Sequence, residues 1–131
     1  MVESLKVGLL FLSIALFMLA SIEFISRKSG LRPEYSRKLA HIGGGLLAVY
    51  FLPIIADVYI IFAIVLILTL VLFLTRWKRL LDSVHEVSRE TLGSIIFPFP
   101  FFVSFFAAQY FGNSIYFYLP ILILVFSDPA A

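Results

Sequence analysis

The first group of residues that could do chemistry is the run R-K-L-A-H, which extends from Arg37 to His41 at the start of a long apolar stretch. Residues three or four positions apart lie on the same face of a helix, so Arg37 and Lys38 can each act together with His41 on one ligand. Ionisable groups just inside a membrane tend to mark functional sites. The alternative interpretation is that the cations anchor the end of a membrane span, while His41 is hydrogen-bonded inside a helical bundle.

The second group is Glu86, Arg89 and Glu90, followed closely by Gly93. Glu86 and Glu90 would share a helix face, and Arg89 adjoins it. Two carboxylates at this spacing can hold a hard cation such as Mg²⁺, or one of them can accept the proton of a hydroxyl group. The alternative is a solvated linker face that carries an ordinary ion pair, which contributes little to stability.

The third group is the segment S-D-P-A-A at residues 127–131, in which Asp128 follows an apolar run that starts at Ile115. A run of about 12 residues rises about 18 Å in a helix, which is less than a bilayer core of about 30 Å. A carboxylate at that depth is costly unless it is paired or bound to a metal. Pro129 would favour a broken helix, which is a common way to build an ion site within a membrane. Alternatively, the span begins earlier in the chain and Asp128 reaches water.

Two further motifs resemble catalytic signatures without fitting them. The segment G-G-G-L-L-A at residues 43–48 matches a dinucleotide-binding fingerprint, but that fingerprint requires a strand before it and this segment lies in an apolar helix. Close helix packing through small residues, including Gly44 and Ala48, is the better interpretation. His85 and Glu86 begin like a zinc-protease motif, but Arg89 occupies the place of the second histidine and cannot bind zinc.

The elements that must position these groups are membrane-spanning helices. The chain is 62% hydrophobic and 14% charged, which differs strongly from a soluble domain of about 25% charged residues. It contains no cysteine, which excludes disulfides and thiolate metal sites. We therefore expect an all-α, multi-pass transmembrane bundle that forms a single domain. Apolar runs predict five spans, with bends near Pro53 and Pro98 and an interruption at Pro120, at residues 7–25, 39–55, 58–74, 92–111 and 115–126.

The basic residues predict how the bundle is oriented. One cluster lies in the linker after the first span, and the second lies in the linker after the third span, between Arg76 and Arg89. With five spans both linkers fall on the same side, and only Lys6 lies opposite. By the positive-inside rule this side is cytoplasmic and the N-terminus is outside. All three chemical groups would then lie at the cytoplasmic face of a cell-membrane protein.

Taken together, these segments resemble the diacylglycerol/polyprenol kinase family, which includes dolichol kinases, phytol kinases and CTP-dependent diacylglycerol kinases. The run from Arg37 to His41 is similar to the family's R-K-x-x-H. The segment E-T-L-G-S-I-I-F-P at residues 90–98 is similar to its acidic-then-glycine segment, and S-D-P-A-A is similar to the start of its D-P-x-A nucleotide motif. The family pattern continues past this point, so we expect the chain to be the N-terminal portion of a longer lipid kinase, completed covalently or by a second chain.

The resemblance implies phosphoryl transfer from a nucleotide, CTP in the well-described members, to a lipid hydroxyl group. It implies that Asp128 binds Mg²⁺ and nucleotide with help from Glu90, and that Arg37, Lys38 and Arg89 hold phosphates. His41 or Glu86 would orient or deprotonate the hydroxyl. The expected partners are therefore a lipid alcohol, Mg²⁺–CTP and membrane lipid, without nucleic acid.

Two other functions remain open at this point. One is cytidylyl transfer to phosphatidate, which would make a CDP-lipid and release pyrophosphate. The other is a non-catalytic membrane subunit or a small transporter, in which the polar groups serve helix packing or an ion path.

Overall fold

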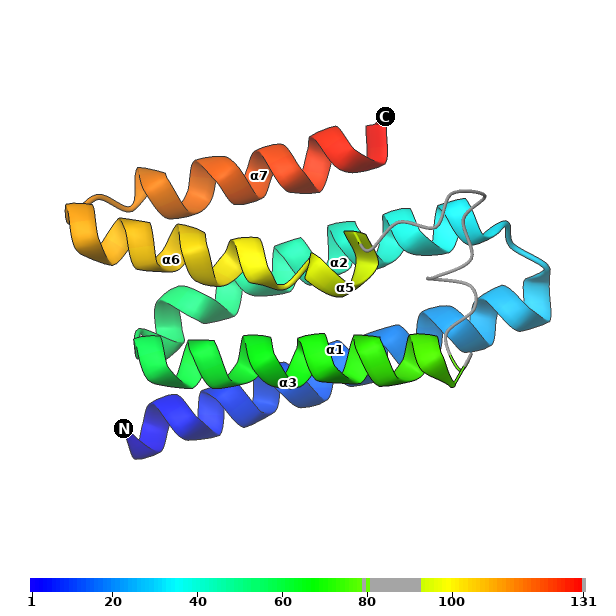
Figure 1. Ribbon diagram of the computed structural model, residues 1–131, viewed down its shortest axis with the longest axis horizontal. Coiled ribbons are helices and arrows are strands. Elements are labelled where there is room, and N and C mark those ends of the chain that lie inside the picture. The colour runs from blue at the N-terminus through cyan, green and yellow to red at the C-terminus, as the bar shows by residue number, and fades with distance from the viewer. Residues whose placement is uncertain (79, 81–92, 131) are drawn as a thin grey trace.

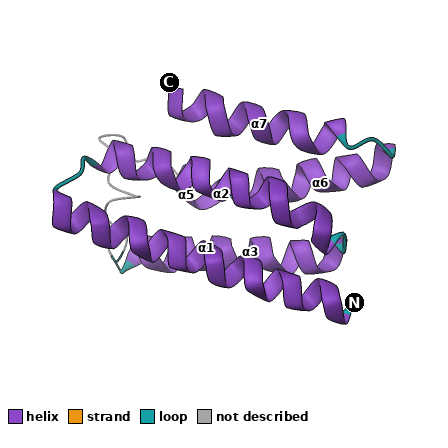
Figure 2. Ribbon diagram, turned by 180° about the vertical axis from the view of Figure 1, so that it is seen from behind, coloured by secondary structure: helices purple, strands orange, loops and turns teal. Residues whose placement is uncertain are grey.

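The computed structural model describes residues 1–78, 80 and 93–130. Of residues 128–130 only the backbone is described. The described part is built from helices without any strand, as Figure 2 shows. Three long helices come first, then a short one, then two of intermediate length: α1 (Val2–Ser29), α2 (Pro33–Ile55), α3 (Val58–Trp77), α5 (Gly93–Ile96), α6 (Phe99–Phe111) and α7 (Ile115–Ala130).

The helices form a membrane bundle. Val2–Ser29, Pro33–Ile55, Val58–Trp77 and Gly93–Phe111 are long and apolar enough to cross a bilayer, and Ile115–Ser127 is a shorter apolar helix. Large apolar side chains cover the outer surface; Phe17, for example, is 75% exposed. A soluble protein rarely exposes so much contiguous apolar surface, whereas lipid tails solvate it well. The predicted all-α membrane bundle is confirmed.

The chain runs back and forth, and α2 lies at the centre, in contact with α1, α3 and α7. The α1–α2 connection and the end of α3 lie at one end of the bundle, whereas the α2–α3 and α6–α7 turns lie at the other (Figure 1). α5 begins and α7 ends partway along α2, on the side toward the first end (Figure 1). We call the first the basic end, because the described cations of both basic linkers lie there: Arg27, Lys28, Arg32, Arg76 and Lys78. The prediction that both linkers share a side is confirmed.

The helices are longer than the apolar runs that predicted them. α1 begins at Val2 and continues to Ser29, where Gly30 ends it in the left-handed conformation (φ 64°). α2 begins at Pro33, six residues before the predicted start. Proline is well suited to the first helical position, since its missing N–H would have no partner there. Hydropathy identifies the part of a helix that crosses the bilayer, whereas capping residues decide where the helix ends.

Prolines act differently at different positions. The second span was predicted to bend or end near Pro53, and α2 ends two residues after it. Pro98 separates α5 from α6, so the helix is interrupted where a kink was predicted. In contrast, α7 continues through Pro120 and Pro129 to Ala130, so the predicted interruption at Pro120 and break beside Asp128 are wrong. Pro120 is the sixth residue of α7 and Pro129 the fifteenth, so each removes one helical hydrogen bond without ending the helix.

Three consecutive glycines let α2 pack against three different neighbours. A Cβ atom on Gly43 would meet the sulfur of Met18 in α1, one on Gly44 would come within 3.1 Å of the Phe97 ring, and one on Gly45 would overlap Val125 of α7. Successive helical residues point about 100° apart, so each glycine serves a separate contact. The predicted close packing through small residues is therefore confirmed.

Candidate functional site

His41 lies on the first half of α2 and is buried, with 7% of its surface exposed. Its Nδ1 atom is 3.0 Å from the carbonyl oxygen of Arg37, one turn earlier in the helix. A carbonyl can only accept, so Nδ1 donates the hydrogen bond; in the neutral form of the ring the lone pair is then on Nε2. The ring also stands edge-on to Phe97, with the two ring centroids 4.0 Å apart. These two contacts fix the imidazole in one orientation, as a positioned proton acceptor requires.

Arg37 and His41 line the same pocket at the basic end. This basic-end pocket has a volume of about 370 Å³, and α5 and α7 contribute Gly93, Ile96 and Leu124 to its walls. The two side chains lie one turn apart on α2, which explains why they reach one space. The structure therefore places Arg37 and His41 on one pocket, and their joint action on a ligand stays a prediction.

The Nε atom of Arg37 is buried and has no hydrogen-bond partner among the residues that the structure describes. A buried donor without an acceptor costs about 1–3 kcal/mol, and more when the group is charged. Guanidinium groups bind phosphate and carboxylate through two parallel hydrogen bonds, which satisfy such donors. The site thus contains a cationic donor that is suited to an anionic group.

α7 brings the third predicted group to the same place. α7 runs antiparallel to α2, as the two helices show in Figure 1, and Val125 packs directly against Gly45. Asp128 follows Leu124 by four residues in the same continuous helix, so its backbone lies one turn closer to the basic end. The backbone therefore carries Asp128 to the level at which α2 presents His41.

Lys38 is placed differently from Arg37. Its ammonium group lies 3.4 Å from a carboxylate oxygen of Glu34, one turn earlier in α2. Adjacent residues of a helix point about 100° apart, and Lys38 is not among the residues that line the basic-end pocket. The structure therefore brings Arg37 and His41 together and leaves Lys38 in an ion pair beside them.

The second predicted group falls on residues that the structure does not describe. Glu86, Arg89 and Glu90 all lie within residues 81–92, outside the described ranges. The predicted Mg²⁺ ligands were Asp128 and Glu90, and neither side chain is described. Within the side chains that are described, there is no group of three histidine, cysteine, aspartate or glutamate residues that could hold a metal ion.

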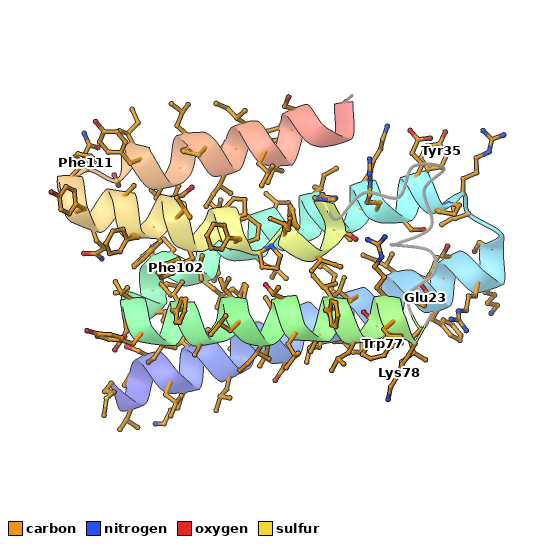
Figure 3. The ribbon with its side chains drawn as sticks, in the orientation of Figure 1. Glu23, Tyr35, Trp77, Lys78, Phe102 and Phe111 are labelled. Carbon is orange, nitrogen blue, oxygen red and sulfur yellow. The ribbon has the colours of Figure 1, made fainter. Side chains whose placement is uncertain are left out.

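A polar pair that was not predicted from the sequence lies inside the first helix. Glu23 of α1 is 7% exposed, and its carboxylate accepts a hydrogen bond from Nε of Arg27 at 2.5 Å. Arg27 also donates to the carbonyl of Leu80 at 3.0 Å, which connects α1 to the segment after α3. Figure 3 shows Glu23 at the same end of the bundle as Trp77 and Lys78. The sequence does contain a signal for this ion pair, because Glu23 lies four residues before Arg27 and the two therefore share a helix face.

Two more residues of the site were missed by sequence reasoning. Ser94 is buried, with 8% of its surface exposed, and it lines a small cavity together with His41 and Phe97. Both Ser94 and Phe97 lie in the segment quoted for the family resemblance, but nothing local to them indicates a contact with α2. Such a contact depends on how α5 packs, which no spacing rule supplies.

Comparison with known proteins adds no assignment. No family model, curated protein or solved structure matches the chain significantly.

Proposed function

We propose that this chain carries the phosphoryl-transfer site of a membrane lipid kinase that uses CTP. The observation that supports the proposal is the convergence of separate motif segments on one pocket. Arg37 and His41 come from α2, Gly93 from α5, and Leu124 from α7, one turn before Asp128. Segments more than 50 residues apart in the sequence therefore meet at the end of the bundle that holds the basic residues.

The roles follow from the chemistry of each group. Arg37, with its unsatisfied donor, binds the phosphates of the nucleotide. His41 accepts the proton of the lipid hydroxyl through Nε2 as the oxygen attacks the terminal phosphorus and CDP leaves. The ring contact with Phe97 and the hydrogen bond to the Arg37 carbonyl hold the imidazole in place for this transfer.

The remaining residues complete the proposal. Asp128 and Glu90 are the residues proposed to hold Mg²⁺, which would neutralise phosphate charge when bound. Lys38 and Arg89 add positive charge near the nucleotide, and Glu86 is the alternative proton acceptor. None of these five roles is derived from a contact described above, so each remains tied to the family resemblance.

A membrane location suits this reaction. The hydroxyl of a lipid alcohol lies near the interface while its tail stays in the hydrocarbon. A pocket at the end of a bundle meets that hydroxyl without removing the tail from lipid. If the basic end faces the cytoplasm, as the positive-inside rule indicates, the pocket also opens toward the compartment that contains CTP.

The decisive experiment is product analysis. The purified full-length protein in lipid vesicles is incubated with Mg²⁺, a lipid alcohol and CTP labelled on its terminal phosphate. We expect labelled lipid monophosphate, and we expect His41→Ala to lower its formation at least about 100-fold, as for loss of an acid–base group. Lys6→Ala, which changes an exposed cation at the other end of the bundle, is the control and should leave the rate unchanged. Formation of a CDP-lipid with phosphatidate, or no transfer to any alcohol, would contradict the proposal.

A further inference from the structure

A second cavity lies on the other side of His41 and Phe97 from the basic-end pocket. These two residues line both spaces, so the paired rings form a shared wall between them. The cavity lies among α1, α2, α3 and α5, and its walls include Ala15, Leu68 and Leu72. His41 and Ser94 are its polar side chains, and the rest of its lining is apolar. We call it the apolar cavity.

The size of the apolar cavity limits what can enter it. Its volume is about 50 Å³. One water-sized position corresponds to about 10–15 Å³ on this measure, so the cavity holds roughly four such positions. A methylene group is close to water in size, and the cavity therefore fits roughly four or five carbon atoms, comparable to one isoprene unit.

We infer that the apolar cavity receives the first carbons of a single-chain lipid alcohol, and that the site therefore selects isoprenoid-type alcohols over diacylglycerol. The inference rests on the proposed function and names its substrate class. The hydroxyl lies beside His41, and the hydrocarbon next to it fills the space between Ala15, Leu68 and Leu72. The hydroxyl is then at the wall that the apolar cavity shares with the basic-end pocket, where Arg37 lies.

The chemistry near the hydroxyl separates the two lipid classes. In a polyprenol, the carbons that follow the hydroxyl carry only hydrogen and methyl groups. In diacylglycerol, two ester groups lie within a few atoms of the hydroxyl. Burying a carbonyl without a hydrogen-bond donor is unfavourable, and few of the side chains that line the apolar cavity can donate.

The rest of the lipid's hydrocarbon chain can leave the apolar cavity between α1 and α2. Met18 lines the apolar cavity, is partly exposed, and packs over Gly43. A methionine side chain is flexible and adapts to neighbours of different shape. Met18 is therefore the part of the cavity wall that moves aside most easily, and the lipid chain would pass it to reach the bilayer.

The test is photo-crosslinking with a farnesol that carries a diazirine on its first isoprene unit. We expect labelling of the residues that line the apolar cavity, mapped by mass spectrometry. A tenfold excess of geranylgeraniol should reduce this labelling about tenfold by mass action, and the same excess of 1,2-dioctanoylglycerol should leave it nearly unchanged. Ala15→Leu, which fills the apolar cavity, should abolish the labelling. Ala63→Leu, the same change on the lipid-facing side of α3, should retain it.

Each result decides the inference. Labelling that dioctanoylglycerol displaces as well as geranylgeraniol does, or labelling that is confined to the outer surface, overturns it. If Ala15→Leu does not fold, the competition with the unchanged protein still decides. Crosslinking needs no nucleotide, so site-specific labelling of a protein that transfers no phosphate would refute the proposed function and leave this inference standing.

Discussion

At the scale of single residues, the two arginines of the basic end illustrate different uses of a cation. Arg27 satisfies a carboxylate within its own helix and a carbonyl beyond α3. Arg37 lines a pocket, and within the described part of the chain its buried Nε has no acceptor. A structural cation is normally satisfied within the fold, whereas one that binds a ligand keeps a donor for it. The difference supports a binding role for Arg37.

CTP binding should therefore require arginine, and not merely a positive charge, at position 37. We expect Arg37→Ala to weaken CTP binding at least about tenfold, since a charge-assisted hydrogen bond contributes about 1.5–3 kcal/mol. Arg37→Lys should restore little of this affinity, because an ammonium group cannot make the paired hydrogen bonds of a guanidinium. Titration of labelled CTP against the purified variants measures both effects. Full affinity in Arg37→Lys would show that charge alone is recognised.

The ion pair between Glu23 and Arg27 should contribute to the free energy of unfolding. We expect Arg27→Ala to lower the free energy of unfolding by about 1–3 kcal/mol, since it removes one partner of a buried carboxylate. Because the Arg27 side chain is 61% exposed, solvent screening favours the lower part of this range. The matched control is Lys6→Ala, which breaks the exposed pair between Lys6 and Glu3. Denaturation in detergent should show almost no change for this control; equal losses in both variants would refute the distinction.

At the scale of helices, α2 is the element to which the site belongs. It carries Arg37 and His41, and its three glycines admit α1, the Phe97 ring and α7 as close neighbours. The same substitution, glycine to alanine, can therefore be compared at Gly43 and at Gly45. The added methyl group meets a flexible side chain at Gly43 and a fully buried branched one at Gly45.

We expect Gly45→Ala to destabilise the protein and Gly43→Ala to be nearly neutral. The Met18 side chain can move away from a new methyl group, and alanine itself favours a helix by about 1 kcal/mol over glycine. Val125 is confined, so overpacking against it should cost about 1–3 kcal/mol and push α7 away from α2. Thermal unfolding of both variants measures the difference.

The second half of this test is a rescue. In the double variant Gly45→Ala with Val125→Ala, the removed atoms make room for the added methyl group. The double variant should therefore be more stable than the sum of the two single changes predicts. Additive losses would show that Gly45 and Val125 do not constrain each other.

The helices also show what the sequence could predict. Apolar runs gave the spans, and prolines gave the bends at Pro53 and Pro98, because both signals are local. The helices extend beyond the predicted spans, since polar residues 33–38 continue α2 before the apolar run. The closeness of Arg37 and His41 was predictable from their spacing. The contact between His41 and Phe97 was not, since it depends on how two distant segments pack.

At the scale of the whole molecule, the described cations of the two basic linkers gather at one end of the bundle (Figure 1), and the basic-end pocket is lined by Arg37 from the half of α2 that leads to this end. We expect a cysteine at Ser29 to be protected from an impermeant thiol reagent in intact cells, and a cysteine at Asn113 to react. Both positions are exposed, they lie at opposite ends, and the chain has no other cysteine. Labelling at Ser29 from outside would reverse the orientation and separate the pocket from cytoplasmic CTP.

The packing of Val125 into Gly45 has a consequence for how the protein is made. These residues are about 80 positions apart, and synthesis adds about 5–20 residues per second, so α2 exists for about 4–16 s before α7 arrives. During that time α1, α2 and α3 can already pair in the membrane, while the glycine face that α7 will cover is occupied by lipid. His41 and Arg37 then have no α7 wall beside them. The first helices are therefore inserted before the basic-end pocket is complete. The pocket is completed only when α7 packs against α2.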